Sequence, residues 1–133
     1  MSNIESHGLQ VKLDVPYEDA LERTTAALKE QGFGVLTQID VRATLKKKLN
    51  ADFRRYIILG ACNPPLAHQV LQTELQAGLV LPCNVVVYEE DGGSVVSIAD
   101  PLPMIGVVGN ADLEPLAREA RTRLQRVIEA LGS

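Results

Sequence analysis

The sequence predicts an α+β fold with two layers, in which helices cover one face of a mainly antiparallel sheet. Three observations lead to this prediction. Residues 9–15 alternate between apolar and polar side chains, as in a half-buried strand. Two valine-rich runs flank the sequence EEDGG, whose Asp-Gly and Gly-Gly pairs supply the positive φ angles of a tight hairpin. Near the end of the chain, residues 113–131 repeat apolar side chains at helical spacing, which predicts a long amphipathic helix.

The first half of the chain predicts two helices and one further strand. Apolar residues recur at helical spacing between residues 17 and 28, and Gly32 follows at a position suited to a helix end. Residues 33–39 (FGVLTQI) are rich in β-forming side chains and predict a second strand. Asp40 is a good cap for a short helix over residues 41–49, whose apolar side chains fall four residues apart.

The second half predicts the remaining strands. A third strand is expected over residues 53–59. Asn63 is then a good cap residue, and Pro64 suits the first position of a helix. The hairpin strands are expected over residues 84–88 and 94–99, so the order of elements is β-α-β-α-β-α-β-β-α. The side chains predicted to form the core are Leu21, Leu28, Val35, Ile57, Leu59, Val70, Leu71, Val87, Ile98, Leu116, Leu124 and Ile128.

The composition limits the number of domains in the chain and the kinds of partner that it can bind. Of the 133 residues, 46% are hydrophobic and 23% are charged, so we expect one globular domain over residues 1–133 with a mobile N-terminal segment, 1–8. The net charge of −4 lacks the excess of Lys and Arg that phosphate binding needs, so no nucleic-acid partner is expected. No apolar run approaches the ~20 residues of a membrane span. The N-terminal residues also lack a secretory signal, so we expect a cytoplasmic protein without a membrane partner.

The common catalytic motifs are absent from the sequence, including the Walker A loop, GxGxxG, HExxH and GxSxG. The two histidines, His7 and His68, lie outside the apolar stripes and are expected at the surface. The basic run Lys46–Lys48 is interpreted as a solvated helix face rather than an anion site, because it belongs to an acidic protein.

Two nearly mirrored tripeptides are the most informative local feature. The first is Cys62-Asn63-Pro64 and the second is Pro82-Cys83-Asn84. The spacing of the cysteines fits neither a CxxC redox motif nor a zinc-finger pair. Both cysteines can be small packing residues and both asparagines turn residues. The same segments also allow a shared site, and the two interpretations stay open.

The shared site depends on how the strands pair. If the third strand and the two hairpin strands form an antiparallel meander, then Cys62, Asn63, Cys83, Asn84 and Asp100 converge at one edge of the sheet. These five residues are the candidate ligand-binding residues. If the strands around the third helix are instead parallel, the two cysteines lie at opposite edges and no joint site exists.

The chemistry of this edge favours a small ligand or a soft metal ion, although no cofactor can be assigned. The thiolates of Cys62 and Cys83 and the carboxylate of Asp100 are acceptable ligands for such an ion, with Met104 as a candidate fourth. The helix dipole near Cys62 favours its thiolate, whereas the negative charge of Asp100 opposes it. Without a bound cation we therefore expect only modest thiol reactivity.

Four segments carry a resemblance to a known family. FGVLTQIDVRATLKKKL, YIILGACNPPLAHQVLQTE, LPCNVVVYE and the later ADP are similar to the bacterial and archaeal domain of unknown function 302 family. The resemblance extends from about Leu9 to Leu131. It implies a compact α+β domain with a TBP-like sheet, β-α-β(4)-α in outline, here with inserted helices, and often a homodimer. It also supports the antiparallel meander. It implies no activity, because the family is uncharacterised.

Three functions therefore compete. The first is a ligand-binding or soft-metal-binding module at the sheet edge, and the second is a homodimeric interaction protein without a ligand site. The third is a thiol-dependent enzyme that uses Cys62, which is weakened because no histidine is placed as a base. Enzyme activity stays uncertain, and its absence is favoured. Self-association is further suggested by β-branched residues that could be exposed on the sheet, namely Val85, Val86, Val95 and Val96.

Overall fold

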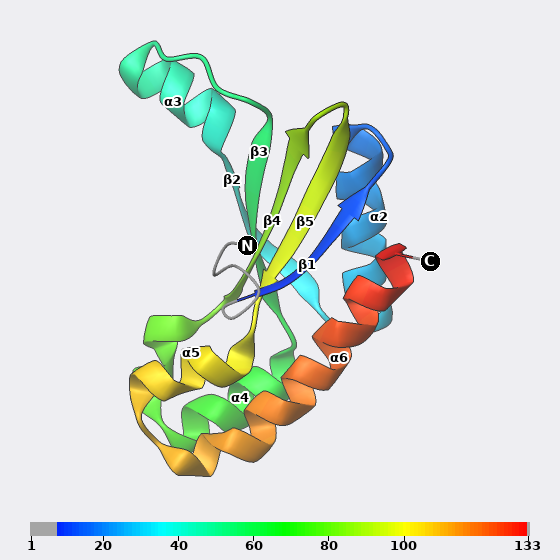
Figure 1. Ribbon diagram of the computed structural model, residues 1–133. Coiled ribbons are helices and arrows are strands. Elements are labelled where there is room, and N and C mark those ends of the chain that lie inside the picture. The colour runs from blue at the N-terminus through cyan, green and yellow to red at the C-terminus, as the bar shows by residue number, and fades with distance from the viewer. Residues whose placement is uncertain (1–7, 133) are drawn as a thin grey trace.

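The computed structural model describes residues 8–132, which form a five-stranded antiparallel sheet and its helices (Figure 1). The strand order in the sheet is β1-β5-β4-β3-β2. The expected mobile segment 1–8 lies outside the described residues, apart from Gly8, with which the first strand begins. The strands are β1 (Gly8–Leu13), β2 (Gly34–Asp40), β3 (Tyr56–Cys62), β4 (Cys83–Glu90) and β5 (Gly93–Ala99).

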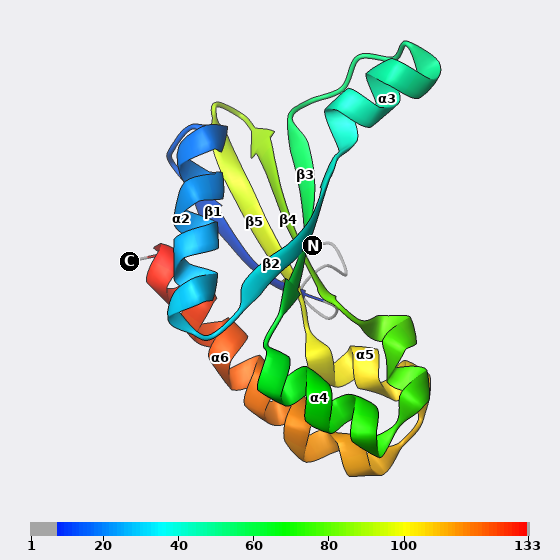
Figure 2. The ribbon, with the colours of Figure 1, turned by 180° about the vertical axis from the view of Figure 1, so that it is seen from behind.

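Two of the helices cover one face of the sheet. The α-helices are α2 (Tyr17–Glu30), α3 (Val41–Leu49), α4 (Pro64–Thr73), α5 (Pro101–Val108) and α6 (Glu114–Gly132), and two short 3₁₀ helices are η1 (Leu75–Val80) and η2 (Ala111–Leu113). α2 and the C-terminal part of α6 lie against the same side of the sheet (Figure 2). The predicted α+β fold with a mainly antiparallel sheet is therefore confirmed.

The main core lies between the sheet and these two helices. Alternate residues of the central strands, such as Leu59 and Val85, point toward the helices and are fully buried. Leu28 of α2 and Leu124 of α6 close the core from the other side. All twelve predicted core residues pack in one of the two hydrophobic clusters. Five of them are only partly buried, namely Leu21, Val35, Leu71, Leu116 and Ile128.

A second group of helices lies beyond one end of the sheet. We call it the helical lobe, and it comprises residues 63–82 and 100–114, with α4, η1, α5 and η2 (Figure 1). The first turns of α6 pack against it, and three residues form its small core: Val70, Ala77 and Leu113. Neither α5 nor the 3₁₀ helices were predicted, since the all-apolar segment PLPMIGVV has no helical periodicity.

At the opposite end of the sheet, residues 39–55 form a projection that we call the arm. It contains α3, which extends away from the sheet and has no buried residue (Figure 1). The predicted cap is confirmed, because the Asp40 side chain accepts a hydrogen bond from the N–H of Ala43. β3 begins at Tyr56 rather than at the predicted Phe53, because the chain needs these residues to return from the arm to the sheet.

Within the described part of the chain, no helix is long and apolar enough to cross a membrane.

Candidate functional site

The strand register brings the two cysteine tripeptides to the same end of the sheet. β3, β4 and β5 form the predicted antiparallel meander. Ala61 lies opposite Cys83, and Gly60 lies opposite Asn84. Cys62 follows Ala61 on β3, so it lies one residue beyond the position opposite Cys83 on β4. The parallel alternative, which would have separated the cysteines, is excluded by this register.

A cavity of about 520 Å³ lies between this end of the sheet and the helical lobe. Its walls come from both layers. Leu66 and Val70 of α4, Met104 and Ile105 of α5, and Leu116 of α6 face the cysteine-bearing ends of β3 and β4. Among the described residues that line the cavity, none carries a charge. Sequence reasoning missed the α5 wall because α5 itself was not predicted.

Both cysteines line the cavity, and both are half-buried and free of disulfides. Burial raises the pKa of the Cys83 thiol from 9.0 to about 11, with a smaller contribution from the nearby Cys62. A thiol with this pKa is protonated at neutral pH, so Cys83 is a poor nucleophile and a poor metal ligand there. It acts instead as a small and weakly polar part of the wall.

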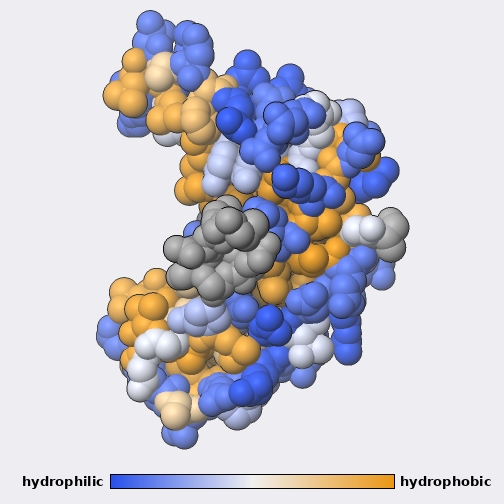
Figure 3. All heavy atoms as spheres, in the orientation of Figure 1, coloured by the Kyte–Doolittle hydropathy of each residue, from blue (hydrophilic) through white to orange (hydrophobic). Residues whose placement is uncertain are grey.

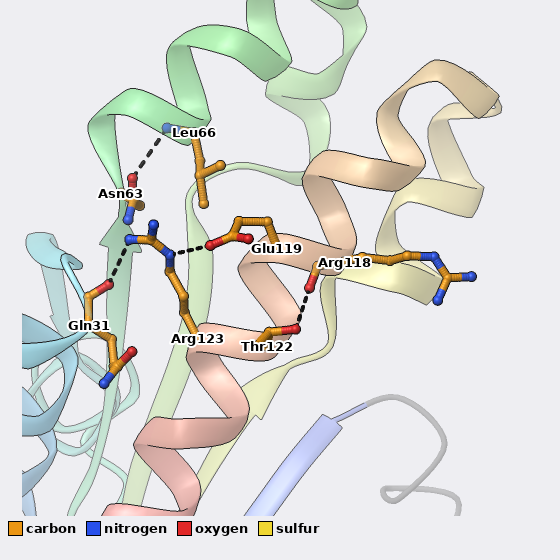
Figure 4. Close-up of polar contacts among 7 residues, drawn as sticks. All are labelled: Gln31, Asn63, Leu66, Arg118, Glu119, Thr122 and Arg123. Atoms are coloured by element: carbon orange, nitrogen blue, oxygen red, sulfur yellow. Dashed lines mark hydrogen bonds and ion pairs between the residues drawn. The ribbon is translucent and has the colours of Figure 1, made fainter.

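The two asparagines differ in their surroundings. Asn63 is buried, whereas Asn84 is exposed at the rim of the cavity. Figure 4 shows Asn63 beside Arg123 of α6, whose Nε contacts Glu119 at 2.7 Å and whose guanidinium reaches the carbonyl oxygen of Gln31 at 3.5 Å. A Cβ atom added at Gly32 would lie 3.0 Å from the Asn63 amide nitrogen. Asn63 is therefore enclosed on this side by the turn after α2.

The N-terminus of α4 offers no free donor to the cavity. The Asn63 side chain accepts a hydrogen bond from the N–H of Leu66 at 3.2 Å. The two residues between them, Pro64 and Pro65, have no N–H group. A helix N-terminus normally binds anions through free N–H groups. At α4 these groups are either missing or already bonded.

The N-terminus of α5 is closed in the same way. Asp100 accepts a hydrogen bond from the N–H of Leu102 at 3.0 Å, and Pro101 and Pro103 have no N–H group. The chain thus repeats one device, an Asx cap followed by two prolines, at both helices that begin beside the cavity.

Of the five candidate residues, Asp100 is the one that does not line the cavity. Its second carboxylate oxygen binds the Nε of Arg121 at 2.9 Å. No group of three or more His, Cys, Asp or Glu side chains that could hold a metal ion occurs within residues 8–132. No such group therefore unites Cys62, Cys83 and Asp100 in this part of the chain, and the Asp100 carboxylate instead caps α5 and pairs with Arg121.

These features describe a mixed α and β protein with a five-stranded antiparallel sheet and an apolar cavity at one end. The family model described as domain of unknown function DUF302 matches residues 9–131, so the chain belongs to this family. It is similar to a solved structure described as an uncharacterized conserved protein DUF302 from Bacillus stearothermophilus. The two chains share 32% sequence identity with a TM-score of 0.87, over 94% of this chain and 98% of the other. No curated protein matches the sequence.

Proposed function

We propose that this protein binds a neutral, apolar small molecule in the cavity between the sheet and the helical lobe. The observation that carries the proposal is the chemistry of the wall, which is apolar and uncharged among the described residues. The volume of about 520 Å³ lies within the range of roughly 300–1,000 Å³ that is usual for small-molecule sites.

The capped N-termini of α4 and α5 favour a ligand without a negative charge. An anion at this position would lose water and find no free backbone N–H group, since both helix N-termini are capped and carry prolines. Desolvation of an unpaired charge is costly. The polar side chains that line the cavity are two thiols and the amides of Asn63 and Asn84. Because the Asn63 oxygen already caps α4, these groups suit one neutral polar end of a ligand.

The proposal is tested with the neutral fluorescent probe N-phenyl-1-naphthylamine and two competitors of equal length, decanol and decanoate. We expect decanol to displace the probe at concentrations at least tenfold lower than decanoate. A variant that fills the cavity, Ala67→Phe, should reduce probe affinity at least tenfold. The matched control is Ala26→Phe, on the exposed side of α2. Equal probe binding by both variants, or preference for decanoate, would contradict the proposal.

The other functions have unequal support. A thiol enzyme would need a base near Cys62, and His68, the histidine within residues 8–132, is exposed on α4. The homodimer has a specific observation in its favour. Large apolar side chains are exposed on the arm and on the helical lobe, where a second copy could cover them.

A further inference from the structure

The arm is a basic projection on an acidic protein. Residues 39–55 contain six Lys or Arg and two Asp, for a net charge of +4. The whole chain has a net charge of −4, so the residues outside the arm carry −8. Figure 3 shows the arm standing clear of the main body, with hydrophobic and hydrophilic residues side by side on it. A partner that meets the arm therefore meets a surface unlike the rest of the molecule.

Three cations of α3 have no counter-charge. Within residues 8–132, no ion pair involves Arg42, Lys47 or Lys48, and all three are exposed. The two aspartates of the arm are both engaged elsewhere. One caps α3, and the other pairs with Lys46 at 3.3 Å between the ammonium nitrogen and the carboxylate oxygen. These three positive charges are therefore available to an anionic partner.

The arm also exposes three large apolar side chains. Leu49 is 70% exposed, Ile39 is 50% exposed and Phe53 is 43% exposed. Such side chains lose free energy in water and gain it when a partner removes them from water. The arm therefore offers apolar surface next to its unpaired cations.

On α3 the cations flank an apolar stripe. Val41, Leu45 and Leu49 recur every four residues along one side of this helix. At 3.6 residues per turn, Arg42 lies at one edge of the stripe and Lys48 at the other. Long cationic side chains in such positions reach the headgroups of a lipid layer while their apolar neighbours enter its boundary with the acyl chains.

The apolar side chains favour a lipid surface over the other anionic partners. The phosphates of a nucleic acid contact Lys and Arg and offer no apolar layer to Leu49 or Phe53. An anionic bilayer attracts the cations and also removes the apolar side chains from water. Binding of this kind needs no spanning segment, so it agrees with the lack of a spanning helix within the described residues.

The shape of the arm separates its charges from the acidic remainder of the protein. α3 has nine residues and is therefore roughly 13 Å long. It extends away from the sheet, so its basic end lies far from the body (Figure 1). At physiological ionic strength charges are screened over about 8 Å. The acidity of the whole chain, which led us to expect only a solvated face at Lys46–Lys48, thus does not prevent this end from binding an anionic surface.

We propose that the arm docks this protein on an anionic lipid bilayer. Arg42, Lys47 and Lys48 lie at the phosphate headgroups. Leu49 and Phe53 enter the boundary with the acyl chains, and the helical lobe, with a net charge of −4, points away from the surface. The docking does not rest on the proposed ligand function, because the arm and the cavity lie at opposite ends of the sheet.

The docking is tested by co-sedimentation of the full chain with vesicles of phosphatidylglycerol or of phosphatidylcholine. We expect at least tenfold stronger binding to phosphatidylglycerol. Raising the salt concentration from about 0.1 M to about 1 M shortens the screening length from about 10 Å to about 3 Å and should release most of the bound protein. Equal binding to the two lipids, or no binding to phosphatidylglycerol, would overturn the proposal.

Variants without selected charges locate the contact. Lys47→Gln combined with Lys48→Gln should weaken binding to phosphatidylglycerol at least tenfold. The matched control is Arg23→Gln combined with Lys29→Gln, which removes two exposed cations of α2 that form no ion pair within residues 8–132. It should bind like the wild type, as should Ala67→Phe in the cavity. Equal losses in the two double variants, or a loss in Ala67→Phe, would contradict docking through the arm. Melting curves by circular dichroism confirm that each variant is folded.

The apolar contact has its own test, because the chain contains no Trp. Phe53→Trp places a single indole on the arm, and its emission should shift to shorter wavelength with phosphatidylglycerol vesicles. Leu75→Trp, at an 81% exposed position of the lobe, is the control and should not shift. Leu49→Ser should weaken vesicle binding at least fivefold, whereas Leu75→Ser should not. A shift on the lobe alone would overturn the orientation. Tighter binding to duplex DNA than to vesicles would assign the arm to nucleic acid, and a wild-type dimer that binds no vesicles would assign it to a second copy of the chain.

Discussion

The main core and the helical lobe bury apolar side chains in different ways. Between the sheet and the helices α2 and α6, residues such as Leu28, Leu59 and Leu124 have no exposed surface. In the lobe the apolar core consists of Val70, Ala77 and Leu113, and the apolar side chains that pack against these three are half-buried. The difference arises because many of those neighbours face the cavity rather than each other. The main core is closely packed, whereas the lobe leaves apolar side chains facing the cavity.

The connection between the two regions is polar. Asp100, at the junction of β5 and α5, caps α5 and pairs with Arg121 of α6. Arg123 of α6 contacts the turn that follows α2. α6 is therefore shared, since its first turns pack on the lobe and its later turns on the sheet. Because the two apolar clusters are separate, we expect the lobe to differ from the sheet in local stability.

The largest expected effect comes from the same truncation made in each core. Leu124→Ala should lower the free energy of unfolding by roughly 2–5 kcal/mol, because it removes a fully buried side chain from closely packed surroundings. Leu113 is equally buried, but it belongs to the core of the lobe, whose side chains line the cavity. The unfolding free energy lost in Leu113→Ala should therefore lie near the lower end of that range. Urea denaturation followed by circular dichroism measures both values.

The region in which each variant loses protection from hydrogen exchange sharpens this comparison. Hydrogen exchange should show lost protection confined to α4, η1 and α5 in Leu113→Ala, and spread over the sheet in Leu124→Ala. A larger loss of stability in Leu113→Ala, or an unchanged midpoint in Leu124→Ala, would show that the two cores do not differ as described.

A smaller effect is expected at the polar connection. Asp100→Ala removes both the cap of α5 and the partner of Arg121, and should cost about 1–2 kcal/mol of unfolding free energy. The matched control is Glu114→Ala, which removes a solvent-exposed pair with Arg118 within α6 and should cost about 0.5 kcal/mol or less. Equal costs in denaturation would mean that the partly buried Asp100 adds nothing to the attachment of the lobe.

Local patterns were sufficient for the main core and insufficient for the lobe. The alternation in β1 and the hairpin signal between β4 and β5 depend on neighbours in sequence. They left the pairing of β3 open, so the cysteines were expected together only if the strands formed an antiparallel meander, and the register of β3, β4 and β5 is that meander. The pairing of Asp100 with Arg121 depends on how α6 crosses the lobe, which no local pattern specifies. α5 has only its cap and prolines as a signal, because its side chains are apolar on every face.

The sheet face away from α2 and α6 also differs from the expectation. Val85 and Val96 were among the valines that could be exposed, but both are fully buried under the helices, and Val95 is buried as well. Of the four valines, Val86 alone is half-buried. A run of valines fixes a strand but not which residues face the helices, and that choice follows from the register across the sheet.

The smallest expected effect concerns alkaline pH and distinguishes the two cysteines of the cavity. The folded state raises the pKa of Cys83 to about 11, so its protonated thiol contributes stability that is complete below pH 9. As the pH rises from 9 toward 11 the unfolded chain loses this proton more readily than the folded chain, and the contribution declines. At pH 10 the loss should be about 1 kcal/mol. We expect Cys83→Ala to lose less stability than Cys62→Ala between pH 8 and pH 10 in urea denaturation, with both variants keeping the tyrosines that also titrate there. Parallel declines in the two variants would show that Cys83 is solvated, and that the cavity wall at this point is less apolar than the structure indicates.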